Sequence, residues 1–308
     1  MNEKKKLILK KSVIVAMLVA LCFAATFINI QMPTGDMVHL GNFVMIITAL
    51  LLGGLEGGLV GSLGMGLYDI IFYSSRPTTI IRTFILKFLV GFLVGFLFRL
   101  VLKKKINTKA LLISSIGFFI VLFGVSLTLF IVGDKSGFGF SNGLAAILHV
   151  SSKSVKISLF IPIFSALFAI GLGIALILSR KLPTRSKAAL FAITIAILVN
   201  ILGEFLLRWL FEGTWNTLIG GLAAENAFSA SLLTATSKIP GSLITGFISV
   251  LLTVLIYEPV YLGVKHLDVF QDNTLLYDER NSEEEKEDTK EVENVGSSNN
   301  STPLHGNI

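Results

Sequence analysis

Long hydrophobic runs separated by short polar stretches occupy most of the first 265 positions. A helix that crosses a bilayer needs about 20 mostly apolar residues. The runs that approach or reach this length each predict one membrane span, and there are eight: 12–31, 40–55, 58–75, 79–102, 110–133, 157–179, 187–211 and 239–262. Only a glycine-rich stretch separates the second run from the third, which predicts a tight turn there. The pattern therefore predicts an all-α polytopic membrane protein with about eight transmembrane helices.

The first run follows a cluster of lysines between positions 4 and 11. A cleaved signal peptide also begins this way, but its apolar region is shorter and a small-residue cleavage site follows it. Here the run is long and leads into the polar positions 29–33, so an uncleaved span is favoured.

Basic residues also cluster after the fourth and sixth runs, at 103–109 and 180–187. Lys and Arg accumulate in the cytoplasmic loops of membrane proteins. With eight spans, all three basic clusters fall on one side, which places both termini in the cytoplasm. The loops expected to face outward are 32–39, 76–78, 134–156 and 212–238.

Composition agrees with a membrane body and adds a different tail. Of the 308 residues, 53% are hydrophobic and 15% are charged, against about 25% charged residues in soluble domains. The net charge of +6 hides a split, because the chain from 271 onward has three basic and ten acidic residues. This segment has too little apolar surface to fold, so we expect a disordered acidic tail. Nucleic-acid binding is not indicated, since most basic residues flank apolar runs.

Polar residues inside the spans point to function. An ionisable group in hydrocarbon costs about 2.5–3.5 kcal/mol on insertion scales, so it needs a partner or a purpose. In the predicted orientation nearly all of these groups lie in the outer half of the membrane, except Arg99, which we expect to reach the inner surface. A channel would need a polar path through the full thickness, so the pattern favours an outward-open pocket. The predicted solute-binding residues are His39, Asn42, Arg82, Lys87, Asn200, Glu204, Arg208 and Lys238.

Internal pairing is the alternative for several of these residues. Glu204 and Arg208 are one helical turn apart and can neutralise each other. Asp69 can pair with Lys87 or Arg82 inside the bundle. Both alternatives stay open, although neither explains why the polar groups gather in one half of the membrane.

Signatures of chemistry are missing from the sequence. It contains no P-loop and no His-Glu-x-x-His zinc helix. The four histidines are dispersed and Cys22 is the only cysteine. We therefore expect no enzymatic activity, no metal site and no cofactor.

Small residues recur at helical spacing. Ala16, Ala20 and Ala24 share one face of the first span, where another helix can approach closely. That helix can belong to the same bundle or to a partner protein. Similar spacing in the third and fourth spans predicts internal packing by Gly57, Gly61, Gly64, Gly91 and Gly95.

Two blocks of sequence, 36–42 (DMVHLGN) and 49–69 (ALLLGGLEGGLVGSLGMGLYD), resemble the substrate-binding S components of energy-coupling factor (ECF) transporters. The resemblance continues through 77–91 and resumes at 200–205 and 238–241, covering about two thirds of the chain. It implies a vitamin-capture subunit that works with a scaffold membrane protein and two ATP-binding-cassette ATPases on separate chains.

In this family an alanine-rich face of the first helix contacts the scaffold, and Ala16, Ala20 and Ala24 match that pattern. S components are thought to topple in the membrane with their vitamin bound. Solute contacts come from the loop after the first helix and from the last three helices. Riboflavin, pantothenate, a pyridoxine-like ring or a thiamine precursor all remain open, and a small basic excess favours an acidic or carbonyl-rich ligand.

The chain departs from the family in length, because typical members are shorter and have six helices. The expected organisation is a basic cytoplasmic N-terminus, four core helices, an inserted helical pair, the last two core helices and the acidic tail, at 1–11, 12–106, 107–182, 183–265 and 266–308. A stand-alone secondary transporter is an alternative, but no convincing internal repeat is present. A membrane-embedded enzyme is a further alternative, which the absent signatures disfavour.

Overall fold

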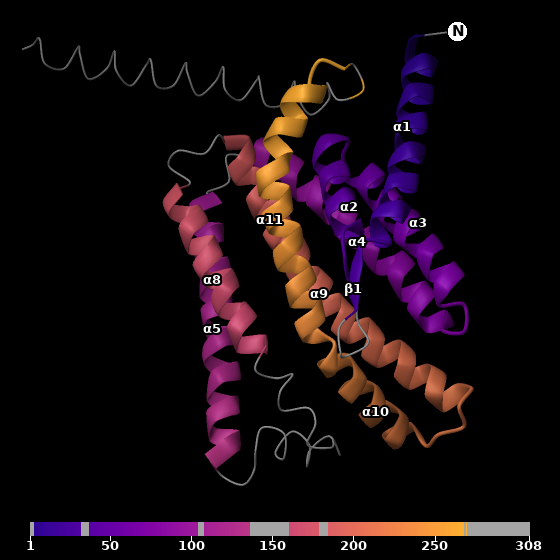
Figure 1. Cartoon of the computed structure of the whole chain (residues 1–308), viewed down its shortest axis with the longest axis vertical. Helices are drawn as coiled ribbons and strands as arrows, with labels where there is room; N and C mark the ends of the chain where they lie inside the picture. The colour runs from indigo at the N-terminus through magenta and orange to yellow at the C-terminus, as the bar shows by residue number, and fades with distance from the viewer. Residues whose placement is uncertain are drawn as a thin grey trace, which may run out of the picture.

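The computed structural model describes residues 3–31, 37–103, 108–135, 160–178, 184–267 and 269. Within these ranges the chain forms an α-helical bundle with one short β-hairpin (Figure 1). The helices are α1 (Glu3–Thr26), α2 (Gly41–Leu51), α3 (Gly54–Phe72), α4 (Pro77–Lys103), α5 (Thr108–Lys135), α8 (Phe160–Leu178), α9 (Thr184–Leu218), α10 (Ala224–Ser237) and α11 (Ile239–Val264). The strands are β1 (Asn29–Gln31) and β2 (Met37–His39).

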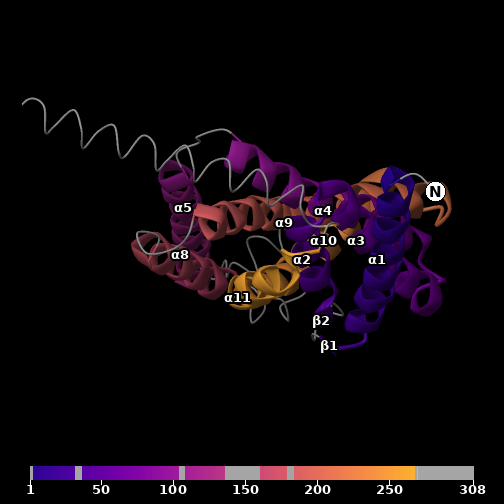
Figure 2. The ribbon, with the colours of Figure 1, turned by 90° about the horizontal axis from the view of Figure 1, so that it is seen from above.

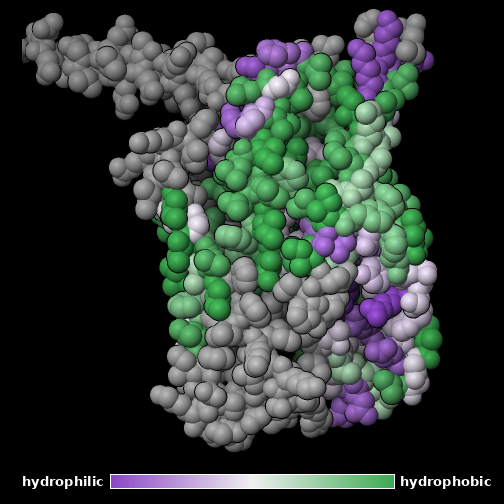
Figure 3. All heavy atoms as spheres, in the orientation of Figure 1, coloured by the Kyte–Doolittle hydropathy of each residue, from purple (hydrophilic) through white to green (hydrophobic). Residues whose placement is uncertain are grey.

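Within the described residues, each of the eight apolar runs coincides largely with a helix. In the described part of the chain, α1, α3, α4, α9 and α11 are long and apolar enough to cross a membrane, and α2, α5 and α8 carry shorter apolar stretches. Figure 3 shows a broad apolar surface with hydrophilic patches where α1 begins and near α9 and α10 at the other end. The prediction of an all-α polytopic membrane protein is confirmed.

The first span is shorter than predicted, because α1 ends at Thr26 and the chain then forms a hairpin. The side-chain amide of Asn29 donates to the Thr26 carbonyl over 3.1 Å, which satisfies an oxygen at the helix end. β1 pairs with β2 in antiparallel register, with Asn29 opposite His39. The predicted loop at 32–39 is thus partly a strand that returns the chain to the end of α1.

The prediction that 212–238 forms a loop is wrong, and the prediction that this segment faces outward stays a prediction. Helix α9 continues to Leu218, and α10 then folds back against it. The Trp209 indole N–H donates to the Phe228 carbonyl over 3.2 Å, and the two rings meet edge to face. The part of α9 beyond residue 211 and the whole of α10 carry no long apolar run, so a search for hydrophobic spans overlooks them. The predicted loop at 134–156 and the acidic tail lie almost entirely outside the described residues.

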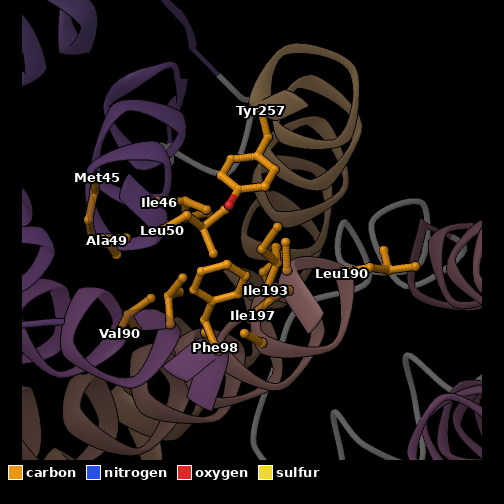
Figure 4. Packing of buried hydrophobic residues seen from close by; sticks show 14 of the residues in the cluster. Met45, Ile46, Ala49, Leu50, Val90, Phe98, Leu190, Ile193, Ile197 and Tyr257 are labelled. Atoms are coloured by element: carbon orange, nitrogen blue, oxygen red, sulfur yellow. The ribbon is translucent and has the colours of Figure 1, made fainter. Parts of the chain in front are cut away.

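The buried apolar core joins helices that are distant in sequence (Figure 4). Ile46 and Leu50 on α2 meet Phe98 on α4, Ile193 on α9 and Tyr257 on α11. Lipid tails are as apolar as these side chains, so close packing rather than exclusion of water holds such helices together.

Glycines allow α3 and α4 to approach backbone to backbone. A Cβ atom on Gly91 would lie 2.6 Å from the Gly57 carbonyl carbon, and one on Gly95 would overlap the backbone of Gly54. The predicted internal packing role of the glycines is confirmed at this seam. No larger residue fits without moving the two helices apart.

The turn between α2 and α3 also depends on glycine. Gly53 has a φ of 124°, which residues with a Cβ atom rarely adopt. Arg99, expected to extend to the inner membrane surface, donates from Nη2 to the Leu52 carbonyl over 3.0 Å and so ties α4 to the turn. Lys11 on α1 pairs with Glu56 at 2.6 Å beside the same turn.

Helices α5 and α8 form a pair at the flank of the bundle. They pack on each other, with Phe119 and Phe168 stacked at 4.7 Å, and they contact α9 and α11. Seen from above, this pair and α1 lie on opposite sides of the structure (Figure 2). The pair is therefore peripheral to the packing of α1 to α4.

We expect Gly91→Ala to destabilise the protein by about 1–3 kcal/mol, because the added methyl group meets backbone that cannot yield locally. Thermal unfolding in detergent measures the effect. Gly117→Ala on α5 is the matched control, since a Cβ atom there meets nothing within 4 Å. Equal melting temperatures for the two variants would contradict the close backbone contact between α3 and α4.

Candidate functional site

A cavity of about 590 Å³ lies at the end of the bundle away from the lysines that begin α1. Its volume falls within the roughly 300–1,000 Å³ typical of small-molecule sites. The lining comes from α1 to α4, from α9 to α11 and from the hairpin, and no described residue of α5 or α8 belongs to it. The cavity includes all the residues predicted to bind solute: His39, Asn42, Arg82, Lys87, Asn200, Glu204, Arg208 and Lys238. Their binding of a solute stays a prediction.

Buried ion pairs between α4 and α9 form the centre of the cavity wall. Arg82 Nε lies 3.1 Å from Glu204 Oε2, and its Nη1 lies 3.7 Å from Glu212 Oε1. Lys87 Nζ lies 3.6 Å from Glu204 Oε1 and donates to Asn200 Oδ1 over 2.8 Å. Arg82 is 4% exposed and Lys87 is 5% exposed, so both cations depend on these partners.

Arg208 completes this network from within α9. Its guanidinium lies 3.8 Å from Glu204 and 3.3 Å from Glu212. Glu204 and Arg208 therefore do not neutralise only each other, because Arg82 and Lys87 also contact Glu204. The network joins residues of α4 and α9 that are more than one hundred positions apart in sequence, such as Lys87 and Asn200 at a separation of 113.

Asp69 has a different partner from those considered in the sequence. Its carboxylate accepts a hydrogen bond of 2.5 Å from the hydroxyl of Thr83. Arg82 and Lys87, its proposed partners, make ion pairs with Glu204 and also lie near enough to Asp69 to attract its carboxylate. Asp69 therefore lines the cavity as a carboxylate anchored by a hydroxyl group.

His39 and Asn42 provide an uncharged part of the lining. The Gly41 N–H donates to His39 Nδ1 over 3.2 Å, so the proton of the neutral ring lies on Nε2. Burial, together with the nearby charge of Lys87, lowers the pKa of His39 to about 3. Asn42 is 6% exposed, and its Oδ1 has no hydrogen-bond partner among the described residues. A buried amide oxygen without a partner indicates a place for a donor from a bound molecule.

Sequence reasoning missed Glu212 and Trp215, which also line the cavity. Both lie in the segment that was taken for a loop. Asn200, Glu204 and Arg208 are spaced four residues apart, and position 212 follows at the same spacing. Extending the predicted helix by one turn therefore places Glu212 on the same face.

We expect Glu204→Gln to destabilise the protein by about 3–5 kcal/mol, because it leaves buried cations without their shared carboxylate. The melting temperature in detergent reports this loss. Glu225→Gln removes a carboxylate from an exposed position on α10, and its effect should stay within about 0.5 kcal/mol. A Glu204→Gln variant as stable as the Glu225→Gln control would refute the role of the network.

Affinity for a bound solute should show no inflection near pH 6.5, the ordinary pKa of histidine. The lowered pKa keeps His39 neutral until the pH falls to about 3, so any contact that needs the neutral ring persists through the physiological range. Binding titrations across pH test this, with His39→Gln as the control. An inflection near pH 6.5 that His39→Gln abolishes would contradict the assignment.

Comparison with known families places the chain. The model of the family described as the ECF-type riboflavin transporter, S component, matches residues 6–179, which is more than half of the chain. The matched range runs from α1 through α8 and ends before α9. Searches of curated proteins and of solved structures found no match. The matched family consists of transporter subunits rather than enzymes. The chain therefore belongs to the family of ECF-type riboflavin transporter S components.

Proposed function

We propose that this chain captures a riboflavin-type vitamin from outside the cell and delivers it to an ATP-driven importer. The observation that carries the proposal is the meeting of eight predicted polar residues in one vitamin-sized cavity of an apolar bundle. The family match supplies the class of solute.

The cavity faces outward in this proposal, with both chain termini in the cytoplasm. The lysines of α1 lie at the opposite end of the bundle from the cavity. Basic residues favour the cytoplasmic side. The Lys11–Glu56 pair and the α2–α3 turn then lie toward the cytoplasm as well.

The energy for uptake comes from other chains in this proposal. The sequence has no P-loop, which agrees with ATP hydrolysis by two ATPases on separate chains that a scaffold membrane protein connects to this chain. Ala16, Ala20 and Ala24 are exposed on α1, while Cys22 and Ala25 face the bundle. This exposure favours the docking role over packing of the three alanines within their own bundle. A flat exposed alanine face suits close contact with a scaffold helix.

The positions of helices α5 and α8 agree with the proposal that they are an insertion added to the vitamin-binding core. They line no described part of the cavity and pack at the flank of α9 and α11. The family match nevertheless runs through both helices, so the insertion at 107–182 stays a proposal.

We expect Ala20→Trp to abolish assembly with the scaffold protein and the ATPases while vitamin binding is retained, because the indole prevents close helix contact. Affinity purification of the co-expressed complex measures assembly. Val254→Trp is the control, since it places the same side chain at an exposed position on α11. Normal assembly of Ala20→Trp would refute the docking role.

Reconstituted vesicles test the importer itself. The complete complex should take up riboflavin only when ATP is supplied on the side of the membrane where the ATPases lie. The isolated chain should take up none. Uptake by the isolated chain in ATP-free vesicles would overturn the ATP-coupled function and support a stand-alone secondary transporter.

A further inference from the structure

The charges at the buried centre of the cavity balance one another. Three cations meet three carboxylates there: Arg82, Lys87, Arg208, Asp69, Glu204 and Glu212. A net charge inside a membrane protein is costly, so this balance favours an uncharged bound molecule over an ion. Recognition of such a molecule depends on hydrogen bonds, and buried polar groups that still lack a partner show where these form.

Asn42 supplies one hydrogen-bond acceptor. It lies in the first turn of α2 and lines the cavity. The residue is 6% exposed, and its Oδ1 has no hydrogen-bond partner among the described residues. An unpaired acceptor in so buried a position is unfavourable, and a donor on a bound molecule removes that cost.

Lys87 supplies a donor from α4. An ammonium group has three N–H donors. Lys87 Nζ has two acceptors in the described part of the chain, Asn200 Oδ1 at 2.8 Å and Glu204 Oε1 at 3.6 Å. The third N–H of this buried group can therefore donate to a bound molecule.

His39 supplies a second donor. Its Nδ1 accepts from the Gly41 N–H, so the ring proton lies on Nε2, and the residue lines the cavity. Burial and the charge of Lys87 lower the pKa of His39, so the ammonium group lies near the ring. His39 precedes Asn42 by three positions, and α2 packs on α4. One acceptor and two donors thus gather in one part of the cavity wall.

This set of groups is complementary to an imide. An imide edge presents one N–H between two carbonyl oxygens in a rigid plane, and the ring system of riboflavin has such an edge. A hydroxyl group of the ribityl chain can also donate to Asn42. A single rotatable oxygen would then have to reach all three groups, so the imide fits the set better.

We propose that Asn42, Lys87 and His39 form the specificity subsite for the imide edge of a flavin ring. Asn42 Oδ1 accepts from the ring N–H, and the Lys87 ammonium group and His39 Nε2–H donate to the two carbonyl oxygens. This inference rests on the proposed function, because it names the part of the vitamin that the cavity recognises and the residues that recognise it.

Riboflavin and 3-methylriboflavin are matched probes, since a methyl group replaces only the imide hydrogen. Equilibrium dialysis of the detergent-purified full chain gives both dissociation constants. We expect 3-methylriboflavin to bind at least about tenfold more weakly, because the buried Asn42 oxygen loses its donor. Equal affinity for the two probes would overturn the inference and leave vitamin capture standing. Failure to bind riboflavin at all would remove the proposed function and the inference with it.

Asn42→Ala assigns the preference to its residue. It should weaken riboflavin binding severalfold and abolish the preference over 3-methylriboflavin, since it removes the acceptor and makes room for the methyl group. Asn216→Ala is the matched control, because it removes an amide from another part of the lining and should keep the preference. Melting temperatures show whether both variants are folded. An unchanged preference in folded Asn42→Ala would overturn the subsite.

Lumiflavin separates the imide from the ribityl chain, because it keeps the imide and carries a methyl group in place of that chain. Asn42→Ala should weaken lumiflavin binding by the same factor as riboflavin binding. A loss for riboflavin alone would assign Asn42 to a ribityl hydroxyl and overturn the inference.

The donor role of His39 has its own pair of variants. His39→Leu removes the donor and should weaken binding of both flavins severalfold, whereas His39→Gln keeps an N–H donor and should retain most of the affinity. Equal losses in the two variants would contradict the donor role of His39.

Discussion

The ion pairs that Glu204 makes with Arg82 and Lys87 are the constraint on which the cavity depends. Two nearly buried cations on α4 can persist in an apolar bundle only beside a counter-charge, and α9 supplies it. This requirement sets the rotation of both helices and turns the polar side of each toward the other. The apolar sides of α4 and α9 then face the core and the lipid. The polar sides that face each other form the hydrogen-bonding wall of the cavity.

A second arginine holds α9 at its other end in a different way. Arg185 is 1% exposed, donates to the Tyr257 hydroxyl over 2.5 Å and lies over the Tyr261 ring at 3.3 Å. Phe98 of α4 belongs to the same aromatic enclosure. Here aromatic faces and a hydroxyl group surround the cation, with no part in the cavity. Helix α9 is thus fixed to α4 and α11 near its own N-terminal end and to α4 near the cavity.

Much of this arrangement could be predicted from the sequence, since apolar length identifies spans and the cost of charge in hydrocarbon singles out Arg82, Lys87 and Glu204. The partners of those charges could not be predicted, because pairing depends on how α4 and α9 rotate in the bundle. Helix α10 was overlooked because it lacks a long apolar run, and the hairpin was overlooked because its strands have three residues each. Arg185 is buried on α9 rather than placed in a loop, which could not be predicted, since a charge pattern alone does not reveal an aromatic enclosure.

Native mass spectrometry of the purified chain tests the central claim most directly. The account predicts one small molecule retained per chain, and its loss from Lys87→Met, which removes an ammonium group from the cavity wall and leaves the alanine face of α1 unchanged. Retention of the same molecule by a folded Lys87→Met variant, or a molecule bound away from the cavity, would contradict the claim that the charged cavity between α4 and α9 is the solute site.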